Sequence, residues 1–187
     1  IEAASTKPFG FMPFFPGPGI GGHCIPIDPQ YLAWKMKMLG YDAKLIAVSE
    51  KINSAMPSFV VEKTRLALEN EECSLKEAHL LVLGVSYKAD IGDIRESPAI
   101  EIIRELIPLS LNVQYNDPYI DVLELDGEVF HSASLTAEFL KTIDAVVIVT
   151  DHSIYDYADI MASSKLIIDT RNAVQQSSGT QCKVLKL

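Results

Sequence analysis

The chain has 187 residues, of which 48% are hydrophobic and 22% charged, a composition that excludes a disordered or fibrous protein and indicates a globular one. Its formal net charge of −9 repels phosphate backbones, so we expect no nucleic-acid partner. No apolar run approaches the roughly 20 residues that a membrane-spanning helix needs, so we expect no membrane partner.

The chain opens with a segment rich in aromatic residues, 1–15, in which no helix or strand period is visible, so we expect it to be extended. The next fourteen residues, 16–29, read PGPGIGGHCIPIDP and hold four glycines and four prolines. Glycine lets the backbone approach a ligand closely, and proline fixes φ, so this composition predicts a stiff, irregular loop. We expect the chemistry of the protein to lie in this loop.

A helix is predicted to follow the loop, with Asp28 as its N-cap, Pro29 at its first position and Gly40 just past its end. Cys24 lies before the helix start, where unpaired N–H groups favour a thiolate, although a small buried hydrophobe is an equally good interpretation. A metal site of His23, Cys24 and Asp28 is disfavoured by its ligand spacing. The three cysteines form no C-x-x-C pair, which indicates a reduced, cytoplasmic protein.

A second, longer helix is predicted from about Ala43 to Asn70, because apolar residues recur there at helical spacing. Pro57 should kink this helix or split it in two. Its apolar stripe is long for a small domain, which favours a homodimer through residues 43–70. Burial of the stripe against its own domain is the alternative.

From Ala78 onward, short apolar runs alternate with helical patterns. This alternation is typical of βαβ units, so the predicted fold class is α/β, with a Rossmann-like, doubly wound and mainly parallel sheet. We therefore divide the chain into a loop and helical segment, 1–77, and a Rossmann-like domain, 78–187. The predicted strands are 80–85, 111–115, 145–149 and 166–168, and the predicted helices are 98–107, capped by Ser97, 135–142 and 154–161.

Polar clusters follow three of these strands, at the edge where such sheets bind ligands. Three cations there, Lys88, Arg95 and Arg171, would suit a pyrophosphate, although solvated surface charges are the alternative for the first two. The sequence G-x-G-x-x-G is absent after the first strand, so a nucleotide would have to be bound by side chains. For Asp151 and His152 a hydrogen bond within the loop is the better interpretation.

Four blocks of this sequence closely resemble the UDP-glucose/GDP-mannose dehydrogenase family. They are PGPGIGGHCIPIDP at 16–29, INSAMP at 52–57, GVSYKADIGDIRESP at 84–98 and DTRN at 169–172, in the order of the family. The form GHCIPIDP is most similar to the branch that oxidises UDP-N-acetylhexosamines, such as the UDP-N-acetylglucosamine 6-dehydrogenases, which make uronic acids for surface polysaccharides. Ile27 stands where relatives that act on UDP-glucose usually have lysine, which supports that branch.

The resemblance implies the oxidation of a sugar C6 hydroxymethyl group to a carboxylate with two NAD. Cys24 matches the nucleophile of the family, which attacks the intermediate aldehyde and passes through a thiohemiacetal and a thioester. Asp28 matches a carboxylate that positions or activates water. The resemblance also implies contacts with the UDP-sugar substrate, made by Gly21, Gly22, Tyr87, Lys88 and Arg171.

Arg95 matches a residue that reaches NAD from this side of the cleft. The NAD-binding domain of the family, with its catalytic lysine and asparagine, has no counterpart in this sequence. The resemblance therefore implies that NAD is bound mainly outside this chain and that the chain alone is inactive. A non-catalytic module that binds UDP-sugars or only dimerises is the competing interpretation, and the pairing of Cys24 with Asp28 favours the enzyme.

Overall fold

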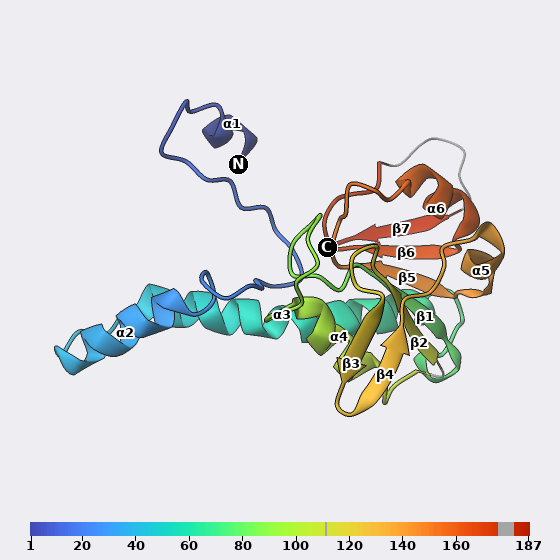
Figure 1. Cartoon of the computed structure of the whole chain (residues 1–187), viewed down its shortest axis with the longest axis horizontal. Coiled ribbons are helices and arrows are strands. Elements are labelled where there is room, and N and C mark those ends of the chain that lie inside the picture. The colour runs from blue at the N-terminus through green and yellow to red at the C-terminus, as the bar shows by residue number, and fades with distance from the viewer. Residues whose placement is uncertain (111, 176–181) are drawn as a thin grey trace.

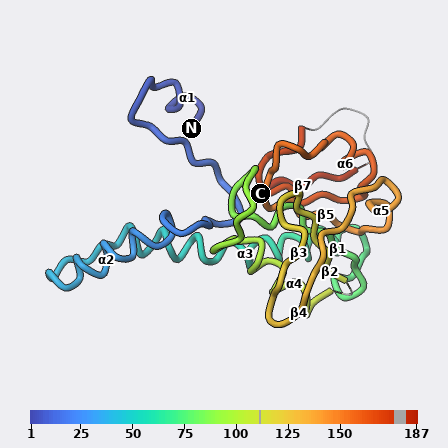
Figure 2. The backbone as a smooth tube through the Cα atoms, viewed as in Figure 1, coloured from blue at the N-terminus to red at the C-terminus, as the bar shows by residue number. Residues whose placement is uncertain are grey.

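A computed structural model describes residues 1–110, 112–175 and 182–187 (Figure 1). A five-stranded sheet forms the centre of the larger body, and a helical arm made of α2 and the first part of α3 extends away from it (Figures 1 and 2). All neighbouring strands of the sheet are parallel. Their order is β2 (Asn112–Asn116), β1 (His79–Leu83), β5 (Ala145–Ile148), β6 (Leu166–Asp169) and β7 (Lys183–Lys186).

Helices cover both faces of this sheet, because its central strands are apolar on both sides. Leu80 and Val82 of β1 face one core, and Leu81 and Leu83 face the other. The first core is closed by α3 (Lys44–Glu69) and α4 (Pro98–Leu106), and the second by α5 (Ala137–Thr142) and α6 (Tyr157–Ser163). The structure thus confirms the predicted α/β class and the mainly parallel sheet.

Helix α2 (Asp28–Met38) ends where the sequence predicts but begins differently. Gly40 has a φ of +79°, and the N–H of Tyr41 donates to the C=O of Met36 at 3.0 Å, which is a Schellman ending. The prediction of Asp28 as N-cap is wrong, because its N–H already donates to the C=O of Cys24 at 2.8 Å. This turn leads directly into the helix, so Ile27 takes the capping position without a side-chain hydrogen bond.

Helix α3 is continuous over 26 residues, so of the two predicted effects of Pro57 the split is wrong and the kink stays a prediction. A proline in a helix leaves one carbonyl, here that of Asn53, without its usual N–H partner. Pro57 is buried, so its ring packs in the interior while that single hydrogen bond is missing. Burial of apolar residues in the second half of the helix outweighs the loss.

The two ends of α3 have different surroundings. Its second half carries Val60 and Leu68, which are 0% and 1% exposed, into the core of the sheet. Its first half leaves Leu45, Val48 and Ile52 exposed by 84%, 54% and 58%. Burial against its own domain therefore accounts for the second half alone, and the predicted homodimer stays a prediction. Among the described residues, none of the helices combines the length and the hydropathy that a membrane span requires.

Several elements were not predicted from the sequence. The segment 1–15, expected to be extended, begins with a short helix, α1 (Glu2–Ser5). The other additions are a 3₁₀ turn, η1 (Leu75–Glu77), strand β7, and a hairpin of β3 (Val122–Leu125) and β4 (Glu128–His131). Leu111, the first residue of a predicted strand, lies outside the described residues.

Candidate active site

The loop predicted at residues 16–29, the glycine-rich loop, crosses the carboxyl end of the sheet (Figure 1). It lies against the loop that joins β1 to α4. The N–H of Gly22 donates to the C=O of Arg95 at 2.9 Å, which fastens the two loops together. A Cβ on Gly21 would lie 2.6 Å from the Cβ of Tyr87, and one on Gly22 would lie 2.9 Å from its ring. Only glycine allows this approach, so the structure brings three predicted substrate-binding residues into contact.

Arg171 reaches the same loop from the end of β6. Its Nε donates to the C=O of Val149 at 2.9 Å and lies 3.7 Å from a carboxylate oxygen of Asp151. A Cβ on Gly17 would lie 2.6 Å from its Nη1, so the guanidinium sits against the glycine-rich loop. Burial lowers the pKa of Arg171, and the charge of Asp151 opposes this shift. Arg171 is therefore a half-buried cation beside the loop.

Arg95 is held by an ion pair on the surface. Its Nη2 lies 2.6 Å from a carboxylate oxygen of Asp93, and its Nε donates to both oxygens of that group at 3.0 Å. Hydrogen bonding to Arg95 lowers the pKa of Asp93 to about 2. The pKa of Arg95 is raised chiefly by its hydrogen bond to Asp93 and further by the charges of Tyr87 and Cys24.

Lys88, in contrast to Arg95, is exposed and has no hydrogen-bond or ion-pair partner among the described residues. An unpaired ammonium beside Tyr87 is free to bind an anion without first breaking another interaction. Lys88 and Arg171 thus offer two different cations at one end of the sheet, the first solvated and the second half-buried.

Cys24 and Asp28 are separated by one turn of backbone and both are exposed. The other two cysteines are only partly exposed, and burial raises the pKa of both, that of Cys182 to about 11. Reactivity of a thiol requires the thiolate and access to it, so Cys24 is the best candidate for a nucleophile among the three.

Two further residues of this region, Asp117 and His152, are completely buried and form a hydrogen bond of 3.0 Å. The sequence predicts a loop hydrogen bond for His152, and the side-chain bonds found join it to two other loops, at Asp90 and Asp117. No role for Asp117 is predicted. Both residues lie within three positions of the end of a predicted strand, which was the available signal. Burial opposes ionisation of Asp117, but hydrogen bonds from His152 and from the N–H groups of Tyr119, Ser86 and Val85 outweigh it and lower the pKa of Asp117.

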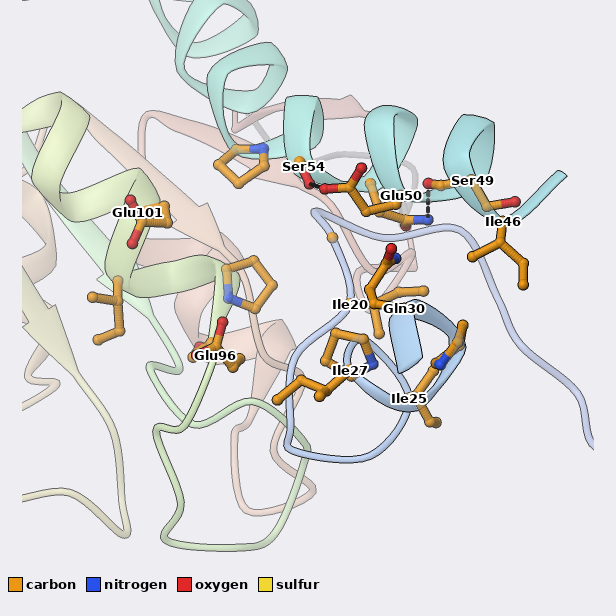
Figure 3. A pocket seen from close by; sticks show the side chains of 18 of the residues that line it. Ile20, Ile25, Ile27, Gln30, Ile46, Ser49, Glu50, Ser54, Glu96 and Glu101 are labelled. Atoms are coloured by element: carbon orange, nitrogen blue, oxygen red, sulfur yellow. Dashed lines mark hydrogen bonds between the residues drawn. The ribbon is translucent and has the colours of Figure 1, made fainter. Parts of the chain in front are cut away.

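A cavity of about 830 Å³ lies behind the glycine-rich loop, between that loop, α3 and the start of α4 (Figure 3). None of the predicted catalytic or binding residues lines it. It is mainly apolar, with Ile20, Ile25, Ile27, Leu45, Ile46 and Ile94 in its wall. The cavity therefore does not coincide with the predicted chemistry. In the described part of the chain, no group of three or more His, Cys, Asp or Glu residues could hold a metal ion.

The sequence of residues 81–176 matches the UDP binding domain of the UDP-glucose/GDP-mannose dehydrogenase family. Residues 1–55 match the central domain of the same family. The chain belongs to this family. The two matches include the glycine-rich loop and the loop that it contacts, and they confirm the resemblance stated from the four sequence blocks.

Similar proteins include the UDP-N-acetyl-D-mannosamine dehydrogenase of Methanocaldococcus jannaschii, with 32% identity over 86% of this chain and 36% of that protein. The UDP-N-acetyl-D-glucosamine 6-dehydrogenase of Pseudomonas aeruginosa is 34% identical over 64% of this chain and 28% of its own length. Among solved structures, that of the UDP-D-ManNAc dehydrogenase of Pyrococcus horikoshii has a TM-score of 0.78 and 31% identity. It covers 98% of this chain and 42% of its own.

The chain therefore spans about a third of the length of the curated relatives that it matches, 36% and 28% for the two named above. The relatives carry names of dehydrogenases that act on sugar nucleotides, and those of the two curated relatives name N-acetylhexosamines.

Proposed function

We propose that this chain forms the substrate-binding part and a portion of the catalytic site of an NAD-dependent 6-dehydrogenase for a UDP-N-acetylhexosamine. The contact of the loop of Cys24 with Tyr87 through Gly21 and Gly22 carries this proposal. This contact supports the proposal because it joins the loop that holds the proposed nucleophile to residues that match the UDP binding domain of the family. The names of the relatives support an N-acetylated sugar, with glucosamine, mannosamine and galactosamine as candidates.

In this proposal, Lys88 and Arg171 bind the diphosphate of the substrate. Lys88 is exposed and Arg171 is half-buried beside Gly17, where lower effective dielectric strengthens its attraction for an anion. Tyr87 offers a ring against which the nucleotide can pack. Local cations of this kind are needed because the chain as a whole carries a net charge of −9 and repels anionic ligands.

Cys24 and Asp28 divide the covalent chemistry. The thiolate of Cys24 would add to the aldehyde carbon of the half-oxidised sugar, giving a thiohemiacetal. NAD, when bound, would accept the hydride in each of the two oxidations. Asp28, one turn away, would position the water that cleaves the resulting thioester and frees the carboxylate.

The described residues do not fit a complete NAD site. The turn after β1 lacks the sequence G-x-G-x-x-G, and the space beside Gly84 is already filled, because a Cβ there would lie 2.3 Å from the C=O of Thr150. Arg95, the one candidate for a contact with NAD, is already paired with Asp93. We therefore propose that NAD is bound mainly by residues outside this chain and that the chain alone does not turn over.

The same proposal assigns the active-site loop and a homodimer helix to residues 1–77, and binding of the UDP-sugar to residues 78–187. The exposed apolar residues of the first half of α3 support the homodimer. We place the activity in the cytoplasm, as a source of uronic acids for polysaccharides.

The incomplete NAD site also favours a second candidate function, a non-catalytic module that binds UDP-sugars or only dimerises.

Calorimetric titration with UDP, UDP-N-acetylglucosamine and NAD tests the proposal. We expect both uridine ligands to bind and NAD not to bind. Lys88→Ala and Arg171→Ala should each weaken UDP binding by about 10-fold to 100-fold, the cost of a lost charge-assisted hydrogen bond. Lys141→Ala, which changes a lysine on the distant helix α5, is the control.

Absence of uridine binding would contradict the substrate-binding role. Alkylation of the three cysteines separates the enzyme from the non-catalytic module. Cys24 should react much faster than Cys73 and Cys182, whereas equal rates at all three would favour the module.

A further inference from the structure

Three loops meet at the carboxyl end of the sheet around Asp117 and His152. Asp117 follows β2 and His152 follows β5, and β1 lies between these two strands. The loop that leaves β1 therefore passes between the two residues. Both side chains are 0% exposed, so neither can touch a ligand.

Asp117 holds the beginning of this loop. Its Oδ2 accepts hydrogen bonds from the N–H of Val85 at 2.7 Å, the N–H of Ser86 at 2.9 Å and the hydroxyl of Ser86 at 3.1 Å. Its Oδ1 accepts from the N–H of Tyr119 at 2.8 Å. A buried carboxylate with this many donors fixes their positions, because each donor would lose its partner if it moved.

His152 holds the loop further along. Its Nδ1 accepts from the N–H of Asp90 at 3.0 Å, and a backbone N–H can only donate, so the proton of the ring lies on Nε2 and is donated to Asp117. The carboxylate of Asp90 in turn accepts from the N–H of Ser153 at 2.8 Å. Tyr119 and Tyr155 pack against the ring of His152, with centroids 5.1 and 5.6 Å away, and fix its orientation.

The held positions, 85, 86 and 90, flank Tyr87 and Lys88 on both sides. Asp90 has a φ of +62°, which a non-glycine residue keeps only where its surroundings hold it. The N–H of Tyr87 donates to the C=O of Asp93 at 2.8 Å, which closes the loop. The buried pair thus fixes a tight loop that carries two predicted contacts for UDP, the partly exposed Tyr87 and the exposed Lys88.

We propose that Asp117 and His152 are positioning residues that set Tyr87 and Lys88 in place for a uridine diphosphate through the backbone of residues 85–90. This inference rests on the proposed substrate-binding function. It gives a role to two buried polar side chains that no step of the proposed chemistry uses directly.

Two substitutions of His152 separate its two hydrogen bonds. His152→Gln keeps an amide N–H near the position of Nε2 but loses the acceptor for Asp90, whereas His152→Asn keeps an amide oxygen near Nδ1 and loses the donor to Asp117. His131→Gln, which changes an exposed histidine of β4, is the matched control. The measurements are amide hydrogen exchange of residues 85–93 without ligand and the dissociation constant for UDP.

We expect His152→Gln to speed exchange in residues 85–93 and to raise the dissociation constant for UDP, each about tenfold, with exchange in β5 and β6 unchanged. His152→Asn, which keeps the acceptor for Asp90, should retain most of the protection of residues 85–93 against hydrogen exchange. His131→Gln should change neither measurement. If His152→Gln fails to fold, Asp90→Ala takes its place, because Asp90 is exposed and anchors the same end of the loop.

Faster exchange throughout the sheet would overturn the proposal, since the pair would then only stabilise the fold. A loosened loop with unchanged affinity for UDP would overturn it as well. If the unsubstituted chain does not bind UDP, the proposed function fails by itself. In that case the hydrogen-exchange data alone test whether the pair positions the loop. Unchanged exchange of residues 85–93 in His152→Gln would overturn that role.

Discussion

At the scale of single residues, two different constraints select the glycines of this chain. Gly40 is needed for its backbone, because its φ is +79° and nothing lies within 4 Å of its Cβ position. Gly21 is needed for space, because its φ is not in the left-handed region and its Cβ position is occupied by Tyr87 and the C=O of Glu96. These two residues form a matched pair for testing the contact between the loops.

We expect Gly21→Ala to lower the affinity for UDP at least tenfold, because the glycine-rich loop must move away from Tyr87 to make room for the methyl group. Overpacking of this kind destabilises by about 1–3 kcal/mol. Gly40→Ala should cost about 1 kcal/mol of unfolding free energy through backbone strain and leave the affinity unchanged. Calorimetry and urea unfolding check both, and an equal loss of affinity in the two variants would contradict the proposed site.

At the scale of elements, α3 serves two purposes. Its second half closes the core beside β1, whereas its first half projects with the arm (Figure 1). The same apolar period therefore runs through a buried and an exposed region, and the amphipathic pattern alone cannot distinguish them.

Leu68→Ala should lower the free energy of unfolding by about 2–5 kcal/mol, because the leucine is 1% exposed and its removal leaves a cavity in the core. Ile154→Ala removes a side chain that is 68% exposed and should change the stability by less than about 0.5 kcal/mol. Urea unfolding measures both values. Equal stability of the two variants would show that the second half of α3 is not part of the core.

At the scale of the whole molecule, a net charge of −9 disfavours self-association, while the apolar side chains on the first half of α3 favour it. The hydrophobic term scales with the area removed from water, and Leu45, Val48 and Ile52 supply a continuous stripe at helical spacing. We therefore expect the apolar stripe to outweigh the charge repulsion, so that the chain self-associates.

Sedimentation experiments should show a homodimer whose dissociation constant rises at least tenfold in Ile52→Glu, since a charge would be buried without a partner. Ile154→Glu, which places the same charge on another exposed isoleucine, should leave the dimer intact. A wild-type chain that sediments as a monomer throughout would contradict the homodimer.

Much of the fold could be predicted from the sequence, because helices and strands depend on the spacing of apolar residues within each segment. The apolar runs of β1 and β5 and the cap by Ser97, whose hydroxyl accepts from the N–H of Ala99, occur where expected. The hairpin of β3 and β4 was missed although its signal is local. Asp126 and Gly127 both have positive φ, as a two-residue type I′ turn requires.

The candidate site was readable only in part. The sequence by itself determined which residues are candidates for the site, since the type of side chain and the resemblance single out Cys24, Lys88 and Arg171. Only the tertiary structure decided that Gly21 packs on Tyr87 and that Asp117 pairs with His152, 35 residues away. The physical reason is that helix and strand periods record burial of each segment in turn, whereas contacts between loops arise only when parallel strands bring their carboxyl ends to one edge.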